Sequence, residues 1–451
     1  MKKHEPALSR RDFLSSSLAA GAVGAVGFSV FGPGSLWPLQ PQERGAKLRV
    51  ALVGTGGRGS SLWGRDLLKN YSDVLDMVGL CDVNPIRLEY AKQYIGAACP
   101  TFTDFGQMLS ETKPDAVIVT TVDCFHAKYI CLAMERGCNA ITEKPMCTDE
   151  KMVQDIVNTE KRTGKKLTVT FNYRYGPDAS KIKEILMSGE IGEVLSVDFH
   201  YYLDVFHGAS YFRRWHGFKQ FSGSLLVHKA SHHFDLMNWW LAAEPVEVNA
   251  YGELRKYGYN GKIRGENCRT CPHKATCEFF WDITKDKESM DLYVQAESAD
   301  GYIRDSCVFR ERINIWDTMA VQVRYHNRVM MSYSLNATMP YEGFAAGFNG
   351  SRGRLDVRVY HNQPWPVENL AEFRITENFK SSQTFAIKSG GGGHWGADRV
   401  MQNQIFRKSV PDPLGRPAGS RDGAISALIG IAARRSIEQA RPIKIEELVK
   451  I

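Results

Sequence analysis

The feature that most constrains this chain is an apolar run at residues 48–53 that ends in a glycine-rich loop at residues 54–59. The run is rich in Val and Leu, which predicts a buried β-strand, and the loop reads G-x-G-x-x-G in front of a helical pattern. Gly54 allows a tight turn, Gly56 lets the backbone approach phosphate oxygens, and Gly59 lets the helix pack against the strand. The helix N-terminus adds N–H donors and partial positive charge. The stretch therefore predicts a dinucleotide-binding loop, with a plain glycine turn as the alternative.

A second strand pattern, at residues 74–81, leads into Asp82. Dinucleotide-binding folds hold the ribose hydroxyls with a carboxylate about 20 residues beyond such a glycine loop. Asp82 favours NAD as the cofactor because its charge repels a 2′-phosphate, whereas Arg87 nearby leaves NADP open.

Length and composition limit the class of protein. With 451 residues the chain can bury two cores, and 43% apolar with 24% charged residues is the composition of an ordinary globular protein. The net charge of +7 is distributed over 57 basic and 50 acidic residues without a long basic block, so a nucleic-acid partner is disfavoured.

Residues 1–45 differ from the rest of the chain. Arg10 and Arg11 are followed by an uncharged, Ala/Gly-rich run at residues 15–30 that is too short and too weakly apolar to span a membrane. This combination predicts a twin-arginine export signal with a linker, hence a periplasmic location and no stable membrane span in the mature protein. A disordered basic N-terminus is the alternative. Because this export route carries folded proteins, the protein is expected to take up its cofactor before export.

The remaining chain shows two patterns of apolar residues. From residue 46 to 174 short apolar strands alternate with helical stretches, which predicts an α/β domain with a doubly wound parallel sheet, a Rossmann domain. Residues 175–420 predict an α+β domain with an open, mainly antiparallel sheet and a Cys-rich insertion at residues 265–310. The helical pattern in residues 421–451 is expected to pack back on the first domain. The β-like segments of the second domain lie at residues 194–202, 246–252, 293–297, 318–325 and 329–335.

A candidate catalytic lysine follows a strand of the first domain. Lys144, between Glu143 and Pro145, comes just past the carboxyl end of the predicted strand, the edge where a doubly wound sheet binds ligands. There it can bond a substrate hydroxyl and reach the cofactor. A surface lysine at a turn is the alternative.

A second candidate is the histidine-rich segment at residues 223–240. In a helix His228 and His232 share a face, with Lys229 beside them and Asp235 one turn on. Two imidazoles with a lysine and a carboxylate form a candidate proton-transfer cluster. Two histidines four apart can also share a zinc ion, but no glutamate directly follows His228, as it does in protease zinc helices. Histidines satisfied within a core are the remaining alternative.

The order of these motifs resembles the glucose-fructose oxidoreductase / inositol dehydrogenase / MocA (Gfo/Idh/MocA) family, over roughly residues 48–448. The resemblance rests on the glycine loop, Asp82, Thr121-Val122-Asp123 with His126, Glu143-Lys144-Pro145, Arg174, the histidine segment and Gly350-Ser351-Arg352-Gly353. It implies that Lys144 and His232 act on a substrate hydroxyl while the nicotinamide exchanges a hydride with its carbon. Where the family usually has an aspartate this chain has His228, which alters the proton relay. The implied cofactor-binding residues are Gly54, Gly56, Gly57, Arg58, Gly59, Asp82, Thr121, His126, Glu143 and Lys144.

Several segments are rich in aromatic rings and guanidinium groups, which stack on sugar faces and bond hydroxyls or carboxylates. Arg174 and Tyr175 are the predicted substrate contacts among them, together with Lys229 from the histidine segment. A glycine-rich stretch at residues 390–398 is predicted to be a mobile loop over the cleft and offers His394 as a further contact.

Four cysteines form a separate pattern. Cys268, Cys271, Cys277 and Cys307, with one C-x-x-C pair, suit a tetrahedral structural zinc site. Disulfides are one alternative, since the expected destination is oxidising, and free thiols are another. The other six cysteines scatter over the first domain and are expected to serve as small buried apolar residues.

These observations predict an NAD(P)-dependent oxidoreductase acting on a small carbohydrate, whether a sugar, a polyol or a glycoside. Free nicotinamide cofactor is not expected outside the cytosol, so the cofactor would be held tightly and recycled on the enzyme. An NAD-dependent glycosidase that oxidises, eliminates, hydrates and re-reduces its substrate is the alternative. A non-catalytic sugar-binding protein on the same scaffold is a third hypothesis. The open sheet also predicts a homo-oligomer, since such sheets commonly support oligomers in the family that the chain resembles.

Overall fold

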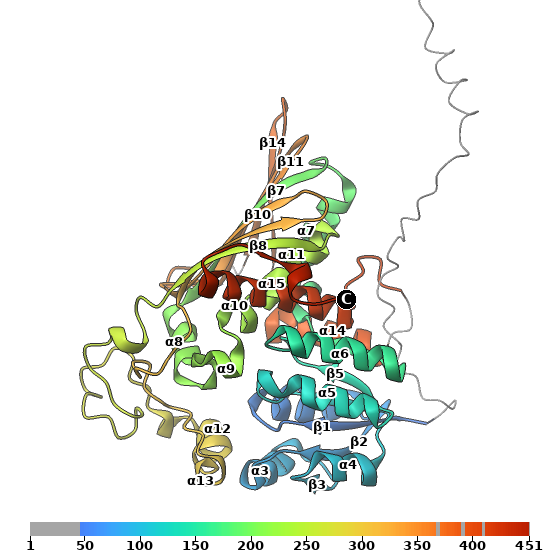
Figure 1. Cartoon of the computed structure of the whole chain (residues 1–451), viewed down its shortest axis with the longest axis vertical. Coiled ribbons are helices and arrows are strands. Elements are labelled where there is room, and N and C mark those ends of the chain that lie inside the picture. The colour runs from blue at the N-terminus through green and yellow to red at the C-terminus, as the bar shows by residue number, and fades with distance from the viewer. Residues whose placement is uncertain (1–45, 367–369, 389–392, 408–410, 451) are drawn as a thin grey trace, which may run out of the picture. The chain divides into compact units, whose positions relative to one another are not determined.

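The computed structural model describes residues 46–366, 370–388, 393–407 and 411–450 (Figure 1). The predicted export signal and linker lie outside these residues, as do residues 390–392 of the glycine-rich stretch. Within the described part of the chain, no helix has the length and apolar character needed to cross a membrane.

The first domain is built on a six-stranded parallel sheet, which confirms the predicted doubly wound fold. Its strand order is β3-β2-β1-β4-β5-β6, so the chain order reverses on either side of β1. Apart from one exposed residue, β1 is buried, which explains its continuous apolar run. Ligands of such sheets lie beyond the carboxyl ends of the strands at this reversal. The strands are β1 (Leu48–Val53), β2 (Leu75–Cys81), β3 (Thr101–Phe102), β4 (Ala116–Val119), β5 (Asn139–Thr142) and β6 (Leu167–Val169).

Helices connect these strands and cover both faces of the sheet. The α3 helix begins where the Asn84 side chain accepts hydrogen bonds from the Ile86 and Arg87 amides, with Pro85 at the first helical position. The turn after the glycine loop is a π-helix, η2 (Gly59–Arg65), which continues into α2 (Asp66–Tyr71). The other helices are α3 (Pro85–Ile95), α4 (Phe105–Thr112), η3 (Asp123–Phe125), α5 (His126–Glu135), α6 (Glu150–Thr163) and η4 (Asn172–Tyr175).

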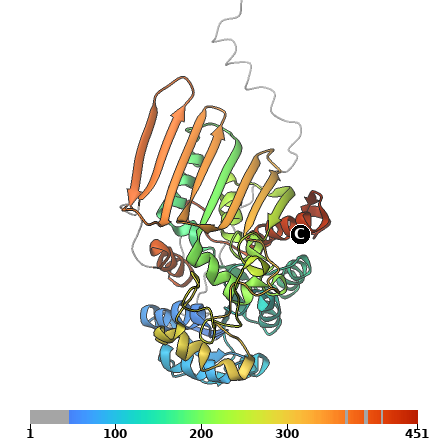
Figure 2. The same ribbon diagram turned by 90° about the vertical axis from the view of Figure 1, so that its left-hand side faces the viewer.

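The second domain carries a nine-stranded sheet, in the order β14-β13-β12-β11-β7-β10-β9-β8-β15 (Figure 2). All neighbouring strands are antiparallel except β7 and β10, so the prediction of a mainly antiparallel sheet is confirmed. Residues of β9 alternate strictly between exposed and buried, as expected for a sheet with one open face. The strands are β7 (Val194–Asp204), β8 (Pro245–Glu253), β9 (Thr318–Tyr325), β10 (Met330–Met339), β11 (Glu342–Gly350), β12 (Gly353–Asn362), β13 (Leu370–Glu377), β14 (Ser382–Lys388) and β15 (Ile443–Lys444).

Helices of the second domain lie between its sheet and the first domain. Every residue of α11 is buried, so the part of the histidine segment that α11 contains lies inside the second domain. The C-terminal helix α15 packs on β8 and α11 of its own domain and on α6 and β6 of the first. These helices are α7 (Pro177–Ser188), α8 (Val205–Arg213), η5 (Trp215–Gly217), α9 (Lys219–Ser222), α10 (Leu225–His228), α11 (Ser231–Leu241), η9 (Gly393–Gly396), α14 (Ala397–Phe406), α15 (Ser420–Gln439) and η10 (Ile445–Glu447).

The predicted strand at residues 293–297 is wrong. This segment is helical and lies in the connection between β8 and β9, at residues 254–317, which contacts α3 of the first domain. Its β-prone residues pack against a helix instead of joining a sheet, so tertiary contact outweighs local propensity. The helices of the connection are η6 (Gly258–Asn260), η7 (Ile283–Lys285), α12 (Lys287–Ser289), η8 (Met290–Val294) and α13 (Glu297–Asp300).

Candidate active site

A cavity of about 1320 Å³ opens where the carboxyl ends of the parallel strands meet the second domain. One wall comes from the glycine loop, the end of β2 and the turn after β5. The facing wall comes from α8, α10, α11 and the start of β11. The edge of the sheet expected to bind ligands therefore faces the histidine segment.

The glycine loop has the geometry of a dinucleotide cradle. Gly54 has a φ of +92°, and a Cβ there would lie 2.7 Å from the Thr120 carbonyl carbon. A Cβ at Gly59 would lie 2.1 Å from the Gly54 oxygen, so this glycine lets the helix approach the loop. Gly56 opens onto the cavity. These residues fit a dinucleotide, because the backbone is free to approach phosphate oxygens.

Asp82 lines the cavity at the end of β2, as predicted for a ribose-binding acid. Its Oδ2 accepts hydrogen bonds from the Thr55 amide at 2.8 Å and the Thr55 hydroxyl at 3.1 Å. Its Oδ1 accepts from the Asn84 amide at 2.9 Å and from Arg87 at 3.2 Å. Arg87 is thus engaged by a carboxylate instead of being free for a 2′-phosphate.

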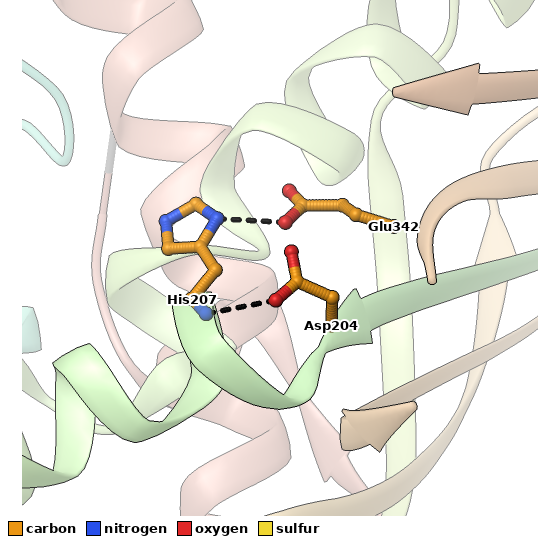
Figure 3. Close-up of side chains that lie close together, drawn as sticks. All are labelled: Asp204, His207 and Glu342. Atoms are coloured by element: carbon orange, nitrogen blue, oxygen red, sulfur yellow. Dashed lines mark hydrogen bonds and ion pairs between the residues drawn. The ribbon is translucent and has the colours of Figure 1, made fainter. Parts of the chain in front are cut away.

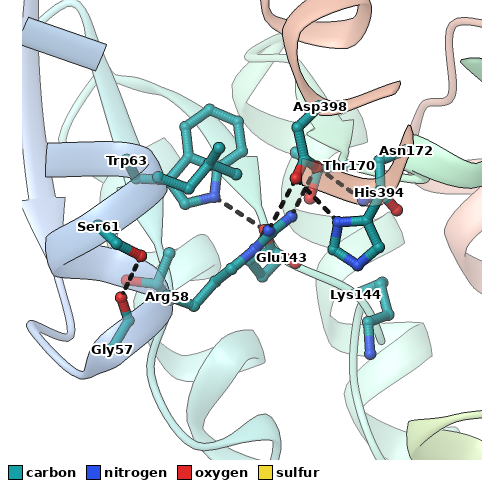
Figure 4. Close-up of polar contacts among 12 residues, drawn as sticks. Gly57, Arg58, Ser61, Trp63, Glu143, Lys144, Thr170, Asn172, His394 and Asp398 are labelled. Carbon is teal, nitrogen blue, oxygen red and sulfur yellow. Dashed lines mark hydrogen bonds and ion pairs between the residues drawn. The ribbon is translucent and has the colours of Figure 1, made fainter. Parts of the chain in front are cut away.

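Glu143 and Arg58 belong to a partly buried ion-pair network beside Lys144 (Figure 4). Arg58 Nε donates to Glu143 at 2.7 Å, and its two terminal nitrogens lie 3.1 and 3.2 Å from the Asp398 carboxylate. Trp63 Nε1 donates to Glu143 at 2.8 Å. Burial alone raises the pKa of Glu143, but the Arg58 charge and these hydrogen bonds outweigh it and lower that pKa. The network holds the turn that carries Lys144.

Lys144 lies in the cavity wall, and its Nζ donates to the His228 carbonyl oxygen at 3.2 Å. Burial lowers the pKa of Lys144 to about 8, although the charges of Asp123 and Glu143 act in the opposite direction. The turn behind it is held by His126, whose ring nitrogens lie 2.8 Å from the Pro145 oxygen and 3.0 Å from the Thr121 oxygen. Lys144 can therefore exchange a proton near neutral pH.

His228 has a carboxylate partner that sequence reasoning missed. Its Nδ1 lies 2.6 Å from Asp123 Oδ2, and both side chains are buried. Burial raises the pKa of Asp123 well above its usual value, and burial with the Lys144 charge lowers that of His228. A contact this short requires a proton between the two atoms, which fixes the imidazole and leaves its Nε2 for the cavity.

His232 lies beside this pair and also lines the cavity. Its ring stacks on Tyr173, with centroids 4.1 Å apart, and burial lowers its pKa well below the usual value. Its Nδ1 is buried and has no hydrogen-bond partner among the described residues. The rings of His216 and His228 meet edge to face, with centroids 4.2 Å apart.

The far end of the cavity contains a polar group made of Asp204, His207 and Glu342 (Figure 3). Their ligand atoms lie within 4.8 Å of one another, a spacing that a metal ion could use. Glu342, however, accepts from Tyr201 at 2.7 Å, contacts His207 at 2.8 Å and has Lys229 Nζ at 3.5 Å. Burial alone would raise the pKa of Glu342, but the Lys229 charge and these hydrogen bonds have the larger effect, so the pKa is lowered. The ammonium already balances its charge, so the group suits hydroxyls better than a cation.

Two predicted substrate contacts are wrong. Arg174 does not line the cavity, because its buried guanidinium bonds Asp235 at 2.6 and 2.8 Å and Asp422 at 2.9 Å. Asp235 is therefore a structural partner, outside the proton-transfer cluster. Tyr175 packs in an apolar core, with the Arg416 guanidinium 5.2 Å from its ring centre. Lys229 and His394 do line the cavity, and His394 Nδ1 lies 2.8 Å from Asp398.

The predicted zinc site at the four cysteines stays a prediction. All ten cysteines lie in the described residues, where each has a free thiol. Across the described residues, the only grouping of three candidate metal-ligand atoms is Asp204, His207 and Glu342. Cys268 Sγ instead accepts a hydrogen bond from Arg213 at 2.9 Å. The four cysteines nevertheless lie near one another, since burial and the charges of Cys268, Cys307 and Cys271 raise the pKa of Cys277, although no three of their sulfur atoms meet at ligand spacing in the described residues.

Two sequence descriptions of one family match the chain. "Oxidoreductase family, NAD-binding Rossmann fold" matches residues 48–171, and "Oxidoreductase family, C-terminal alpha/beta domain" matches residues 183–445. The chain is 35% identical over 427 residues to YteT of Bacillus subtilis, covering 89% of this chain and 99% of YteT.

Two further proteins are similar to this chain, one in part of its sequence and one in its fold. Glycosyl hydrolase family 109 protein 1 of Akkermansia muciniphila is 30% identical over 227 residues, 42% of this chain and 46% of that protein. Levoglucosan dehydrogenase, solved with NADH and L-sorbose, shares the fold with a TM-score of 0.65 at 17% identity, covering 88% of this chain and 99% of that one. The glycine loop, the Lys144 turn and the two matched domains together show that this chain belongs to the Gfo/Idh/MocA family of NAD(P)-dependent oxidoreductases.

Proposed function

We propose that the protein oxidises a hydroxyl group of a sugar, polyol or glycoside, using an NAD that stays bound and is recycled on the enzyme. The observation that carries this proposal is that Lys144, the Asp123–His228 pair and His232 face the same cavity as the glycine loop. When bound, the nicotinamide supplies the acceptor for the hydride that leaves the substrate carbon.

The chain's own residues provide the proton chemistry. Lys144, with a pKa of about 8, takes the proton of the hydroxyl while the carbon loses its hydride. His228, fixed by Asp123, and His232, held by stacking on Tyr173, are placed to carry that proton onward. Where the family resemblance implies an aspartate, this chain has the imidazole of His228 with the Asp123 carboxylate bonded to it.

The polar far end of the cavity supports a carbohydrate substrate. The carboxylates of Asp204 and Glu342 and the imidazole of His207 offer hydrogen-bonding atoms for several hydroxyls. Rings of Tyr173 and Trp395 in the same wall can stack on a sugar face. The sugar-related names of the levoglucosan dehydrogenase and the family 109 glycosyl hydrolase agree with this class of substrate.

A second candidate is a glycosidase that works through oxidation. It would oxidise a hydroxyl, remove a proton from the adjacent carbon as the aglycone leaves, add water and return the hydride. The contact of 3.5 Å between Lys229 Nζ and the Tyr173 hydroxyl favours it, because elimination needs a second acid–base group besides Lys144. The similarity to the family 109 glycosyl hydrolase is consistent with this candidate.

Export and assembly belong to the same proposal. The twin-arginine pattern in residues 1–45 supports a periplasmic protein, where a bound cofactor would have to be regenerated in place. The open face of the second sheet carries exposed apolar side chains, including Tyr251 and Met330, and supports a homo-oligomer. Fractionation of cells and light scattering of the purified protein test these two points.

One experiment separates the two reactions. The purified protein is incubated, without added cofactor, with aryl glycosides and with free sugars. Release of phenol without net change in nicotinamide absorbance supports the glycosidase, whereas accumulation of NADH on a free sugar supports a simple dehydrogenase. Turnover of one sugar only when a second, reducible sugar is present supports internal recycling. Full turnover by a Lys144→Ala variant in every assay would contradict the proposed site.

A further inference from the structure

The connection between β8 and β9, residues 254–317, leaves the second sheet and reaches the first domain beside α3 (Figures 1 and 2). Its helix η8 contacts α3, the helix that follows Asp82. Tyr293, Asp300, Gly301 and Tyr302 of this connection line the same cavity as Gly56 and Gly57. The dinucleotide cradle therefore has a wall supplied by the other domain.

Three polar contacts fasten this wall to the first domain. The Gly57 amide donates to the Tyr293 hydroxyl at 2.8 Å. The Asn84 side chain donates to the Ala296 carbonyl at 2.9 Å. Arg87 is paired with Asp300 at 2.5 Å while it also bonds Asp82. All three first-domain partners belong to the glycine loop or to the start of α3, the two places that hold a dinucleotide in this fold.

The same wall carries positive charge without a full set of partners. The Arg304 guanidinium lies over the Tyr293 ring, 5.3 Å from its centre. Its Nη1 is buried and has no hydrogen-bond partner among the described residues. Arg214, which lines the cavity, feels the Arg304 charge, and burial together with that charge lowers the pKa of Arg214. An anionic group in the cavity would relieve this repulsion.

We propose that residues 254–317 form a clamp that closes over the pyrophosphate of the bound dinucleotide and slows its release. Tyr293, which lines the cavity, is the residue that contacts the anionic group. Arg304 adds positive charge next to the Tyr293 ring, and the Asp300–Arg87 ion pair is the latch. The inference rests on the proposed function, in which one cofactor molecule serves many turnovers.

The chemistry of Tyr293 suits this role. The Gly57 amide, which donates a hydrogen bond to the Tyr293 hydroxyl, is one of the N–H groups that such a loop offers to phosphate oxygens. A phenol hydroxyl both accepts and donates, so Tyr293 can release the amide and donate its own proton to the same oxygen atoms. A hydrogen bond to a charged group is stronger than the neutral one it replaces. Dissociation then requires the connection to separate from α3, which breaks the latch as well.

The test measures how fast cofactor leaves. The purified full-length protein is saturated with NADH and mixed rapidly with a large excess of NAD, and the decay of nicotinamide fluorescence gives the dissociation rate. We compare wild type with Tyr293→Phe, Arg304→Gln and Asp300→Asn. The control is Tyr259→Phe, which removes an exposed phenol of the same connection that bonds the Leu254 oxygen. Thermal unfolding without NADH identifies any variant that folds poorly. Because Asp300 is partly exposed, Asp300→Asn is expected to fold and can be compared with wild type even if another variant does not.

The clamp predicts that each of the three variants releases NADH about tenfold faster than wild type, the loss expected for one charged hydrogen bond, while Tyr259→Phe stays within twofold. Rates equal to wild type in all three folded variants would overturn the clamp and leave the proposed function standing. Accelerated release in a protein that oxidises no sugar and cleaves no glycoside would support the clamp and contradict the proposed function. A protein that binds neither NADH nor NADPH contradicts both.

Discussion

Asp123 Oδ2 lies 2.6 Å from Nδ1 of His228, so a carboxylate stands behind the imidazole at the position where related chains are expected to carry an aspartate. The Asp123 carboxylate lies on η3, just past β4, and faces the cavity through the His228 ring. An Asp–His pair can hold the imidazole in one orientation and stabilise it when it accepts a proton.

The first prediction concerns this pair. Asp123→Asn keeps the shape of the side chain but removes its charge, so we expect kcat to fall about 10²–10⁴-fold, the usual contribution of general acid–base catalysis, with little change in KM. The pH dependence of kcat should change as well, because the pKa of His228 depends on its partner. Asp155→Asn, at an exposed site on α6 paired with Lys151, is the matched control. A variant with wild-type kcat and pH profile would show that Asp123 only supports the fold.

The second prediction concerns pH. Burial lowers the pKa of Lys144 from 10.5 to about 8. If the neutral amine accepts the proton of the hydroxyl, kcat/KM for oxidation should be low in acid, rise as the pH passes through about 8 and then level. The same shift affects stability, because between the folded and unfolded pKa values the unfolded chain binds more protons, so this group adds stability as pH rises above about 8. A value of kcat/KM that stays constant from about pH 6 to about pH 9 would contradict a proton-accepting role for Lys144.

Much of the fold could be predicted because apolar periodicity reports burial directly. The continuous run in β1 marks a strand covered on both faces, and the alternation in β9 marks a strand with one open face. Asp82 and Lys144 could be placed for the same reason, since both follow strands of a parallel sheet and its carboxyl edge binds ligands. Asp123 also follows such a strand, β4, and this signal could have identified it.

Contacts between distant segments explain what the sequence could not reveal. Arg174 reads as a sugar-binding residue until Asp235 and Asp422 are found around it, 61 and 248 positions away in the chain. Tyr293 is separated from Gly57 by 236 positions and reads as part of a strand. No local pattern encodes either pairing, because each depends on how the second domain packs on the first.

The third prediction separates Arg174 from catalysis. Arg174→Ala leaves the Asp235 carboxyl group, whose pKa burial raises to about 7, without its partner. Breaking a buried pair in this way typically destabilises a protein by about 3–5 kcal/mol. We therefore expect a large loss in the free energy of unfolding, measured with urea, and kcat and KM close to wild type for the folded fraction. A selective rise in KM without loss of stability would restore Arg174 as a substrate contact.

The last prediction concerns the polar far end of the cavity. Glu342→Gln removes the charge that balances Lys229 and one acceptor of the group with Asp204 and His207. If this group holds sugar hydroxyls, KM should rise about tenfold, the loss expected for one charged hydrogen bond, while kcat falls less. Added Mg²⁺ or EDTA should not change either constant, because Lys229 already occupies the place of a cation near Glu342. Glu377→Gln, at the end of β13 and paired only with Lys380, is the matched control in the described residues. Activation of wild type by a divalent cation, lost in Glu342→Gln, would instead make the three residues a metal site.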